Sequence, residues 1–298
     1  MKIGFIGLGK MGYNMASKLL YHKHSIVACD RDAKQVIRIQ KKGAIGVRSI
    51  KELVENLPSP KIVWLMIPHQ AVDATIAEIV PLLKTGDILI DGGNSNYNES
   101  VKRSKDLAKK GIKFMDIGVS GGLVAAKTGY CMMVGGDKYA FNIIEPIIRD
   151  MCVPSGYGYF GSSGAGHYVK MVHNAIEYGM MEAIGEGMNL IQNGPYPNIN
   201  QVKLTDVWNN GSIIRSFLME MTNQGLQHHP EMKDVDGFID NTGEGRWSID
   251  EAKKYNVPVP VIATSLDVRL ASNKKKNYGT KIVAVMRDEF GGHGIAKK

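Results

Sequence analysis

The amino-acid sequence predicts an α/β protein in which a doubly wound parallel sheet is followed by an all-α C-terminal domain. In the first half of the chain, short apolar and β-branched runs alternate with helical stretches, and after Gly166 long helical patterns dominate. Strands that are apolar on both faces and separated by helices are typical of a parallel sheet covered on both sides. We therefore expect a sheet domain over residues 1–163 and a helical domain with a C-terminal tail over residues 164–298.

The expected strands are apolar runs bounded by Gly, Asp or Pro. They cover residues 2–7, 24–30, 61–67, 87–93 and 112–118. Residues 130–136 and 156–161 are candidates to extend the sheet, with a helix over about residues 137–150 between them. No further strand is expected after Gly166, so helices should make up the second domain.

The composition is typical of a soluble globular protein, with 44% hydrophobic and 22% charged residues. No apolar run approaches the roughly 20 residues of a membrane span, and the N-terminal segment does not resemble a signal peptide. The three cysteines form no Cys-x-x-Cys pair and are expected to be reduced thiols of a cytoplasmic protein. The net charge of +8 suits an anionic partner, and because Lys and Arg are dispersed, both a small substrate and a nucleic acid remain open.

A glycine-rich turn follows the first predicted strand and opens a helix predicted over residues 11–20. Gly7, Gly9 and Gly12 have a spacing that permits a tight turn and lets a pyrophosphate approach the N–H groups of a helix N-terminus. The second strand ends in Asp30, about 20 residues on, as a dinucleotide-binding motif requires. The sheet domain is therefore predicted to be Rossmann-like. We expect its cofactor to contact Gly7, Leu8, Gly9, Lys10, Met11, Gly12, Asp30, Arg31, Asp32, Met66 and Ile67.

Asp30 also bears on which dinucleotide binds. A carboxylate at this strand end can accept hydrogen bonds from both ribose hydroxyls of NAD, and it repels the 2′-phosphate of NADP. Asp32 adds negative charge, whereas the guanidinium of Arg31 could hold that phosphate. We expect NAD, with NADP as the less favoured alternative.

The segment VKMVHNAIEYGMME, residues 169–182, predicts a helix with an unusual polar face. At about 100° per residue, one stripe collects Lys170, His173, Asn174, Glu177 and Tyr178. The opposite side, with Val172, Ala175, Ile176 and Gly179, is apolar or small and can pack. A solvated surface helix remains one interpretation. Alternatively Lys170 and Glu177, roughly 10 Å apart along the axis, could act on opposite ends of one small molecule, as an acid–base mechanism needs.

Four motifs together resemble those of the 6-phosphogluconate dehydrogenases, the decarboxylating enzymes. They are GAGHYVKMVHNAIEYG (164–179), DGGNSNY (91–97), GVSGG (118–122) and RDEFGGH (287–293). The resemblance runs nearly end to end. The wider β-hydroxyacid dehydrogenase superfamily shares the glycine-rich start, a Ser-Gly-Gly loop and a helix lysine, but normally lacks the His-Asn-x-x-Glu-Tyr continuation. The resemblance implies oxidative decarboxylation of 6-phospho-D-gluconate to D-ribulose 5-phosphate and CO₂, with NAD or NADP reduced and no metal.

The resemblance also implies a role for each matched residue. Lys170 is the general base toward the 3-hydroxyl and later stabilises the enolate, and Glu177 is the acid that protonates C1 of the enediol. The implied substrate-binding residues are Asn94, Ser120, Gly121, Gly122, His173, Asn174, Tyr178, Arg269, Arg287 and His293. Asn94 also contacts the cofactor. In the family, the tail residues corresponding to Arg287 and His293 reach the neighbouring subunit's site, which implies a homo-oligomer, dimer or tetramer.

The chain departs from the commonest form of the family in two respects. It is much shorter, as are bacterial forms that tend to use NAD. Thr242 stands where the long form has a phosphate-binding lysine. Phosphate binding would then rest on Arg269, Arg287 and His293, with help from Arg246.

Two other functions remain as alternatives. One is a β-hydroxyacid dehydrogenase or semialdehyde reductase that does not decarboxylate. The other is a non-catalytic dinucleotide-sensing or nucleic-acid-binding module, which the basic charge permits. Scattered charge without an aromatic-interleaved basic stripe disfavours nucleic acid as a partner.

Overall fold

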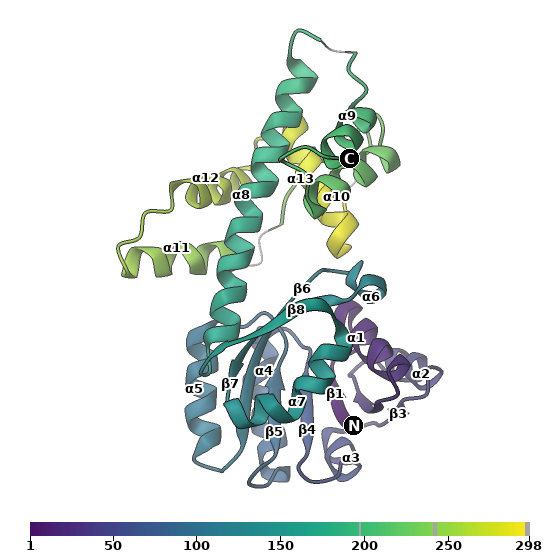
Figure 1. Cartoon of the computed structure of the whole chain (residues 1–298), viewed down its shortest axis with the longest axis vertical. Helices are drawn as coiled ribbons and strands as arrows, with labels where there is room; N and C mark the ends of the chain where they lie inside the picture. The colour runs from purple at the N-terminus through teal and green to yellow at the C-terminus, as the bar shows by residue number, and fades with distance from the viewer. Residues whose placement is uncertain (197, 241–242, 296–298) are drawn as a thin grey trace. The chain divides into compact units, whose positions relative to one another are not determined.

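The computed structural model describes residues 1–196, 198–240 and 243–295. The chain divides into two compact units, Met1–Lys170 and Met171–Lys298, so the division falls inside a long helix, somewhat beyond the boundary expected at residue 163. The first unit is a sheet covered by helices and the second is helical (Figure 1). The predicted fold class is confirmed.

The first unit is built on a single sheet of eight strands in the order β3-β2-β1-β4-β5-β6-β7-β8. The strands are β1 Lys2–Ile6, β2 Ser25–Cys29, β3 Ile45–Gly46, β4 Ile62–Leu65, β5 Ile88–Asp91, β6 Lys113–Ser120, β7 Tyr130–Gly136 and β8 Cys152–Gly161. All seven predicted strands are present, and the two-residue edge strand β3 is an addition. Its shortness explains why no hydrophobic pattern marked it.

One strand pairing differs from the predicted parallel sheet: β7 runs antiparallel to β6, while the other neighbouring pairs are parallel. The cause is the connection between them. Only residues 121–129 join β6 to β7, and a parallel crossover needs about a dozen residues or more. The short connection reverses the chain and keeps the Ser-Gly-Gly loop at the end of β6.

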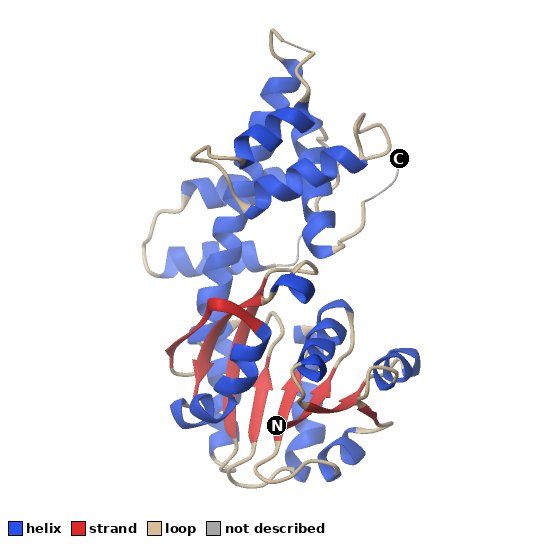
Figure 2. Ribbon diagram, turned by 45° about the vertical axis from the view of Figure 1, so that its right-hand side comes forward, coloured by secondary structure: helices blue, strands red, loops and turns tan. Residues whose placement is uncertain are grey.

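Helices cover both faces of the sheet (Figure 2). They are α1 Lys10–Tyr21, α2 Ala33–Gln40, α3 Ile50–Glu55, α4 His69–Ile79 with the 3₁₀ turn η1 Val80–Leu82, α5 Tyr97–Ala108, the short α6 Ala125–Thr128 and α7 Lys138–Met151. Residues of α1 and α7 pack in the core on one face, and residues of α3, α4 and α5 pack on the other. The predicted helix over residues 137–150 is α7.

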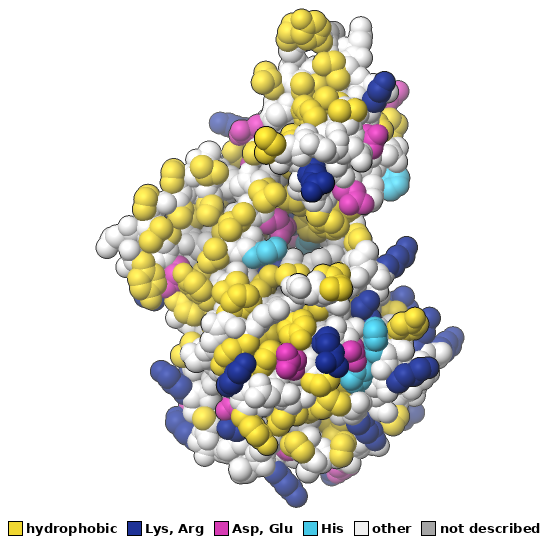
Figure 3. All heavy atoms as spheres, in the orientation of Figure 1, with side chains coloured by type: hydrophobic (Ala, Val, Ile, Leu, Met, Phe, Trp, Pro, Cys, Tyr) yellow, Lys and Arg dark blue, Asp and Glu magenta, His cyan; other side chains and the backbone are white. Residues whose placement is uncertain are grey.

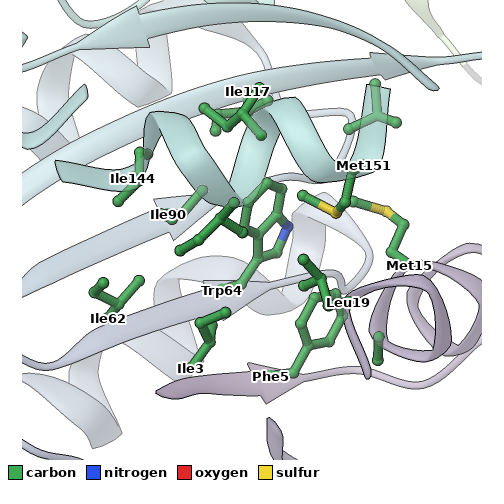
Figure 4. Packing of buried hydrophobic residues seen from close by; sticks show 14 of the residues in the cluster. Ile3, Phe5, Met15, Leu19, Ile62, Trp64, Ile90, Ile117, Ile144 and Met151 are labelled. Atoms are coloured by element: carbon green, nitrogen blue, oxygen red, sulfur yellow. The ribbon is translucent and has the colours of Figure 1, made fainter. Parts of the chain in front are cut away.

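Alternate residues of the central strands enter opposite cores, as strand geometry requires. Ile62 and Trp64 of β4 belong to one cluster, whereas Val63 and Leu65 belong to the other. Trp64 is fully buried and stacks on Phe5 with ring centroids 6.1 Å apart (Figure 4). A strand buried on both faces has the continuous apolar sequence from which the parallel sheet was predicted.

In the described part of the chain the second unit is built from helices, and it includes most of the long helix α8. The helices are α8 Ala165–Asn193, α9 Gln201–Asn209, α10 Phe217–His228, α11 Glu244–Lys254, α12 Pro260–Ala271 and α13 Tyr278–Gly291. Glycines allow two close approaches to α13: a Cβ at Gly185 of α8 would lie 2.9 Å from the Gly279 carbonyl oxygen, and one at Gly225 of α10 would lie 2.7 Å from Val285. Among the described helices, none combines the length and apolarity needed to cross a membrane.

The two sides of α8 do not divide into one buried and one exposed face. The polar residues Asn174 and Tyr178 are buried, at 8% and 4% exposure, whereas Val172 and Ile176 are 37% and 54% exposed. Hydrophobic side chains are visible on the face of the helical unit drawn in Figure 3. The predicted helix is present. On its apolar side Ala175 packs, at 1% exposure, whereas Val172 and Ile176 remain exposed within the chain.

Candidate active site

The glycine turn between β1 and α1 has the shape of a phosphate cradle. Gly7 has φ +96°, and a Cβ at Gly12 would lie 2.1 Å from the Gly7 carbonyl oxygen, so both positions require glycine. A Cβ at Gly9 would meet nothing within 4 Å, and no side chain caps the start of α1 at Gly9. Open space at an uncapped helix N-terminus fits a pyrophosphate.

Other predicted cofactor residues surround this turn. A Cβ at Gly7 would lie 2.3 Å from the Met66 carbonyl oxygen and 2.7 Å from the Ile67 side chain. The Asp30 carboxylate accepts hydrogen bonds from the backbone N–H groups of Leu8 and Asp32. A carboxylate has about four lone-pair sites, so Asp30 keeps acceptor capacity for ribose hydroxyls while it holds the turn.

Asp32 and Arg31 are exposed just beyond β2. The Asp32 side chain accepts a hydrogen bond from the Lys34 N–H at 2.9 Å and forms the N-cap of α2. Its observed contact is therefore a helix cap, which the sequence prediction did not include.

A buried aspartate organises the turn that carries Asn94. Asp91, fully buried at the end of β5, accepts hydrogen bonds from the Gly93 N–H at 3.1 Å, the Ser95 hydroxyl at 2.7 Å and Arg103 at 3.2 Å. Asn94, between these anchored residues, is exposed. Sequence reasoning missed Asp91 and Arg103 as supports, although an aspartate that ends an apolar strand was a usable signal.

Lys170 lies against β6 in the first unit, close to the start of the predicted substrate loop. A Cβ at Gly118 would lie 2.2 Å from the Lys170 Cβ, two residues before Ser120 on β6. Cys131 pairs with Ser120 across the strands; burial raises the pKa of this thiol, and the nearby Lys170 partly offsets the rise. Gly121 and Gly122 both have positive φ, at +113° and +57°.

Asp116 fixes the N-terminal end of α8, which carries Lys170. This fully buried carboxylate of β6 accepts hydrogen bonds from the Gly164 N–H at 2.7 Å and the His167 N–H at 2.9 Å. Both donors belong to the helix start, where backbone N–H groups lack intrahelical partners. Asp116, a second residue that sequence reasoning missed, therefore sets the position of the helix relative to β6.

Further along α8, the predicted polar residues contact one another. His173 Nδ1 lies 3.0 Å from Asn174 Oδ1 and 3.8 Å from the Glu177 carboxylate. Glu177 remains partly accessible, with its side chain 23% exposed. His173, Asn174 and Glu177 therefore form one contacting polar group, and Glu177 remains accessible to solvent.

At the next turn, Tyr178 lies beneath a buried arginine. The Arg269 guanidinium of α12 is 3.5 Å from the centroid of the Tyr178 ring, and a Cβ at Gly245 of α11 would lie 2.7 Å from that ring. Arg269 is 2% exposed, and its Nε and Nη2 atoms have no hydrogen-bond partner among the described residues. Buried donors without acceptors are costly, which makes this a place for an anion.

Arg287 joins this group from α13, within the same chain. It is 5% exposed; burial lowers its pKa, as does the charge of Arg269, while Tyr178, Asp240 and Glu177 act in the opposite direction. Arg287 was expected in a tail that serves a neighbouring subunit. It is a residue of helix α13, and the charges of Tyr178 and Glu177 in its own chain act on its pKa.

The remaining predicted phosphate residues are not brought to this cluster. His293 is exposed beyond the end of α13 and its ring lies edge-on to Phe290, with centroids 6.0 Å apart. Arg246 of α11 is exposed, and Thr242 lies outside the described residues. Within the described ranges, no group of three or more His, Cys, Asp or Glu side chains is placed to hold a metal ion.

Comparison with known proteins gives consistent results for both units. The NAD binding domain of 6-phosphogluconate dehydrogenase matches residues 2–159, and the 6-phosphogluconate dehydrogenase C-terminal domain matches residues 166–282. The chain is 42% identical to Bacillus subtilis YqeC over the full length of both proteins. It is 37% identical to the NAD(+)-dependent, decarboxylating 6-phosphogluconate dehydrogenase of Haloferax volcanii, covering 100% of this chain and 99% of that protein.

Solved structures extend the comparison. Plasmodium falciparum 6-phosphogluconate dehydrogenase superposes with a TM-score of 0.81 at 32% identity, covering 91% of this chain but 62% of that longer one. A Mycobacterium tuberculosis 3-hydroxyisobutyrate dehydrogenase, 19% identical with a TM-score of 0.74, shares the fold over 96% of this chain and 99% of its own. The two domain matches and the full-length relatives show that this chain belongs to the 6-phosphogluconate dehydrogenase family.

Proposed function

We propose that this protein catalyses the oxidative decarboxylation of 6-phospho-D-gluconate to D-ribulose 5-phosphate and CO₂, with NAD as the preferred acceptor. The observation that carries the proposal is the composition of α8 and its surroundings. A buried lysine, a partly accessible glutamate and a tyrosine beneath a buried arginine follow one another along one helix. A sugar acid with a carboxylate at one end and a phosphate at the other requires polar groups in such an order.

The phosphate end would be held by Arg269 and Arg287. A phosphate monoester presents acceptor oxygens to guanidinium groups, which bind it through charge-assisted hydrogen bonds. The Nε and Nη2 donors of Arg269 are buried without acceptors among the described residues. A non-phosphorylated hydroxy acid would leave these donors unmet, which favours the phosphorylated substrate over that of a β-hydroxyacid dehydrogenase.

The reacting end would lie near Lys170 and the Ser120–Gly122 loop. Ser120 and the backbone of Gly121 and Gly122 would hold the carboxylate and hydroxyls, with Asn94, His173 and Asn174 contributing further hydrogen bonds. NAD supplies the hydride acceptor when it is bound at the glycine turn. Gly9, with open space around its Cβ position, and Asp30, with acceptor capacity left, are the residues suited to hold it.

Proton transfer would then fall to two α8 residues. Neutral Lys170 takes the 3-hydroxyl proton as the C3 hydride leaves. As the C1–C2 bond breaks and CO₂ departs, the ammonium of Lys170 stabilises the enolate oxygen. Glu177 donates a proton to the carbon that lost CO₂. Seven residues separate the two groups, about 10 Å along the helix axis, so they can approach the substrate from different ends.

The preference for NAD and the assembly state are parts of the same proposal. A carboxylate at the position of Asp30 favours the ribose hydroxyls of NAD over a 2′-phosphate. We place the protein in the cytoplasm as a homo-oligomer, in which His293 remains a candidate to reach a neighbouring subunit. Arg287 can serve the site of its own chain, because it already lies near Tyr178 and Glu177.

The test is reduced-nicotinamide absorbance with 6-phosphogluconate, run with NAD and with NADP, alongside detection of CO₂. We expect turnover with equimolar CO₂ release and a higher kcat/KM with NAD. Faster turnover of a non-phosphorylated three- or four-carbon hydroxy acid, without CO₂, would identify a non-decarboxylating dehydrogenase instead. Binding of NAD without turnover of any hydroxy acid would support a sensing module.

A further inference from the structure

Glu182 is a buried carboxyl group that the mechanism above does not use. It lies four residues beyond Tyr178 on α8, is 6% exposed, and its Oε1 atom has no hydrogen-bond partner within the described ranges. Residues four apart share a helix face, so Glu182 continues the buried stripe of Asn174 and Tyr178. Buried polar atoms normally have a partner, and this exception calls for a role.

Charged groups from three helices act on Glu182. Arg269 of α12 and Arg287 of α13 favour its ionised form, whereas Glu186, exposed one turn further along α8, disfavours it. Neither arginine forms a salt bridge with a carboxylate in the described part of the chain. The other ionisable groups that act on Arg287 are Tyr178, Glu177 and Asp240. Glu182 is thus a buried carboxyl group whose ionised form both arginines favour, without a salt bridge to either in the described part of the chain.

These opposing influences place the pKa of Glu182 in the neutral range. Burial raises its pKa to about 7, with Glu186 adding to the rise and the two arginines opposing it. A phosphate dianion bound by the arginines would neutralise their stabilising effect and add negative charge nearby. Both changes disfavour a second anion, so the pKa of Glu182 must rise further when phosphate binds.

We propose that Glu182 is a positioning residue that adjusts the charge of the Arg269–Arg287 cluster: above neutral pH it is ionised when the cluster is empty and protonated when a substrate phosphate is bound. Binding of the phosphorylated substrate then takes up one proton. The ionised form balances two buried cations in the free protein, and the neutral form avoids repelling the phosphate. This inference rests on the proposed function only in taking the phosphate of 6-phosphogluconate as the anion.

The sign of the pH effect follows directly. Below pH 7 Glu182 is already protonated and phosphate affinity is independent of it. Above pH 7 the proton must be taken from solution, so KM for 6-phosphogluconate should rise by up to about tenfold per pH unit. Glu182→Gln is permanently neutral. It should therefore match the wild type at pH 6 and have a lower KM than the wild type at pH 8.

The experiment combines this pH profile with calorimetry. Titration of 6-phosphogluconate into the wild-type protein, in two buffers of different ionisation enthalpy, should reveal net proton uptake at pH 8 that is absent in Glu182→Gln. Glu186→Gln removes one negative charge from an exposed position on the same helix. KM should still rise with pH in this variant, but the rise should begin at a lower pH, because Glu186 no longer raises the pKa of Glu182. Binding of gluconate, which lacks the phosphate, should take up the same number of protons in the wild type and in Glu182→Gln.

Two outcomes would overturn the inference while leaving the proposed function intact. One is turnover of 6-phosphogluconate with the same KM profile in wild type and Glu182→Gln. The other is a KM raised equally at every pH in the variant, which would indicate a packing role alone. If the wild type turns over no 6-phosphogluconate, the proposed function itself fails, and calorimetry with inorganic phosphate still tests the proton linkage.

Discussion

At the scale of single residues, the proposed chemistry depends on polar groups that are buried. Lys170 is 7% exposed and lies against β6 at Gly118, where a side chain would collide with it. Arg269 is packed on the Tyr178 ring, with hydrogen-bond donors left over. Burying unmet donors costs free energy unless a ligand completes their contacts. The placement of Arg269 is therefore better explained by the proposed substrate binding than by stability.

The role of Lys170 can be tested by removing its amine. Lys170→Met keeps the length and packing of the side chain, so NAD binding should be nearly unchanged while kcat falls by about 10²–10⁴-fold. Steady-state kinetics and NAD titration by fluorescence measure the two effects. Lys105→Met, an exposed lysine change on α5, is the matched control and should leave both unchanged. Retention of most of kcat in Lys170→Met would exclude Lys170 as the base.

At the scale of elements, two buried aspartates determine where functional segments lie. Asp91 ties the turn after β5 to Arg103 of α5, and Arg103 also pairs with Asp73 at 2.6 Å and Glu99 at 3.0 Å. Asp116 holds the start of α8 to β6. Both act on backbone segments next to proposed ligand-binding residues. The interior strands β5 and β6 therefore hold the segments that carry Asn94 and Lys170.

Removing the Asp91 carboxylate should show this dependence. Asp91→Ala leaves the buried Arg103 with one fewer anion and frees the Gly93 and Ser95 donors, so the free energy of unfolding should fall by about 3 kcal/mol. Urea denaturation measures the loss, and KM for NAD should rise because Asn94 is no longer held. Asp106→Ala, an exposed change on the same α5, should leave both unchanged. An unaltered unfolding midpoint in Asp91→Ala would contradict the supporting role.

At the scale of the whole molecule, one chain contains both arginines that are proposed to bind the phosphate. Longer relatives, such as the Homo sapiens enzyme, are 36% identical over 92% of this chain but only 60% of their own length. Arg269 and Arg287 nevertheless interact within one chain here. In contrast, the apolar side of α8 is exposed, with Val172, Ile176 and Met180 at 37%, 54% and 41%. Exposed apolar patches of this kind mark interaction surfaces, consistent with the proposed oligomer.

A charge placed on this surface should dissociate the oligomer. For Ile176→Lys we expect a molar mass near that of one 32.7 kDa chain, whereas the wild type should give at least twice that mass. Light scattering coupled to size exclusion provides the measurement. Tyr21→Lys, at another exposed apolar residue in the first unit, should keep the wild-type mass. If the wild type is monomeric, or if Ile176→Lys remains assembled, this face of α8 is not the interface.

The sequence by itself determined seven of the eight described strands, the glycine turn, the polar pattern of α8 and the family. These features depend on local periodicity, turn chemistry and short motifs, which neighbouring residues specify. The antiparallel β7, the burial of the polar side of α8 and the meeting of Glu182 with Arg269 and Arg287 were decided only by the tertiary structure. They depend on contacts between residues far apart in the chain, and helical or strand periodicity does not indicate which face a distant segment will cover.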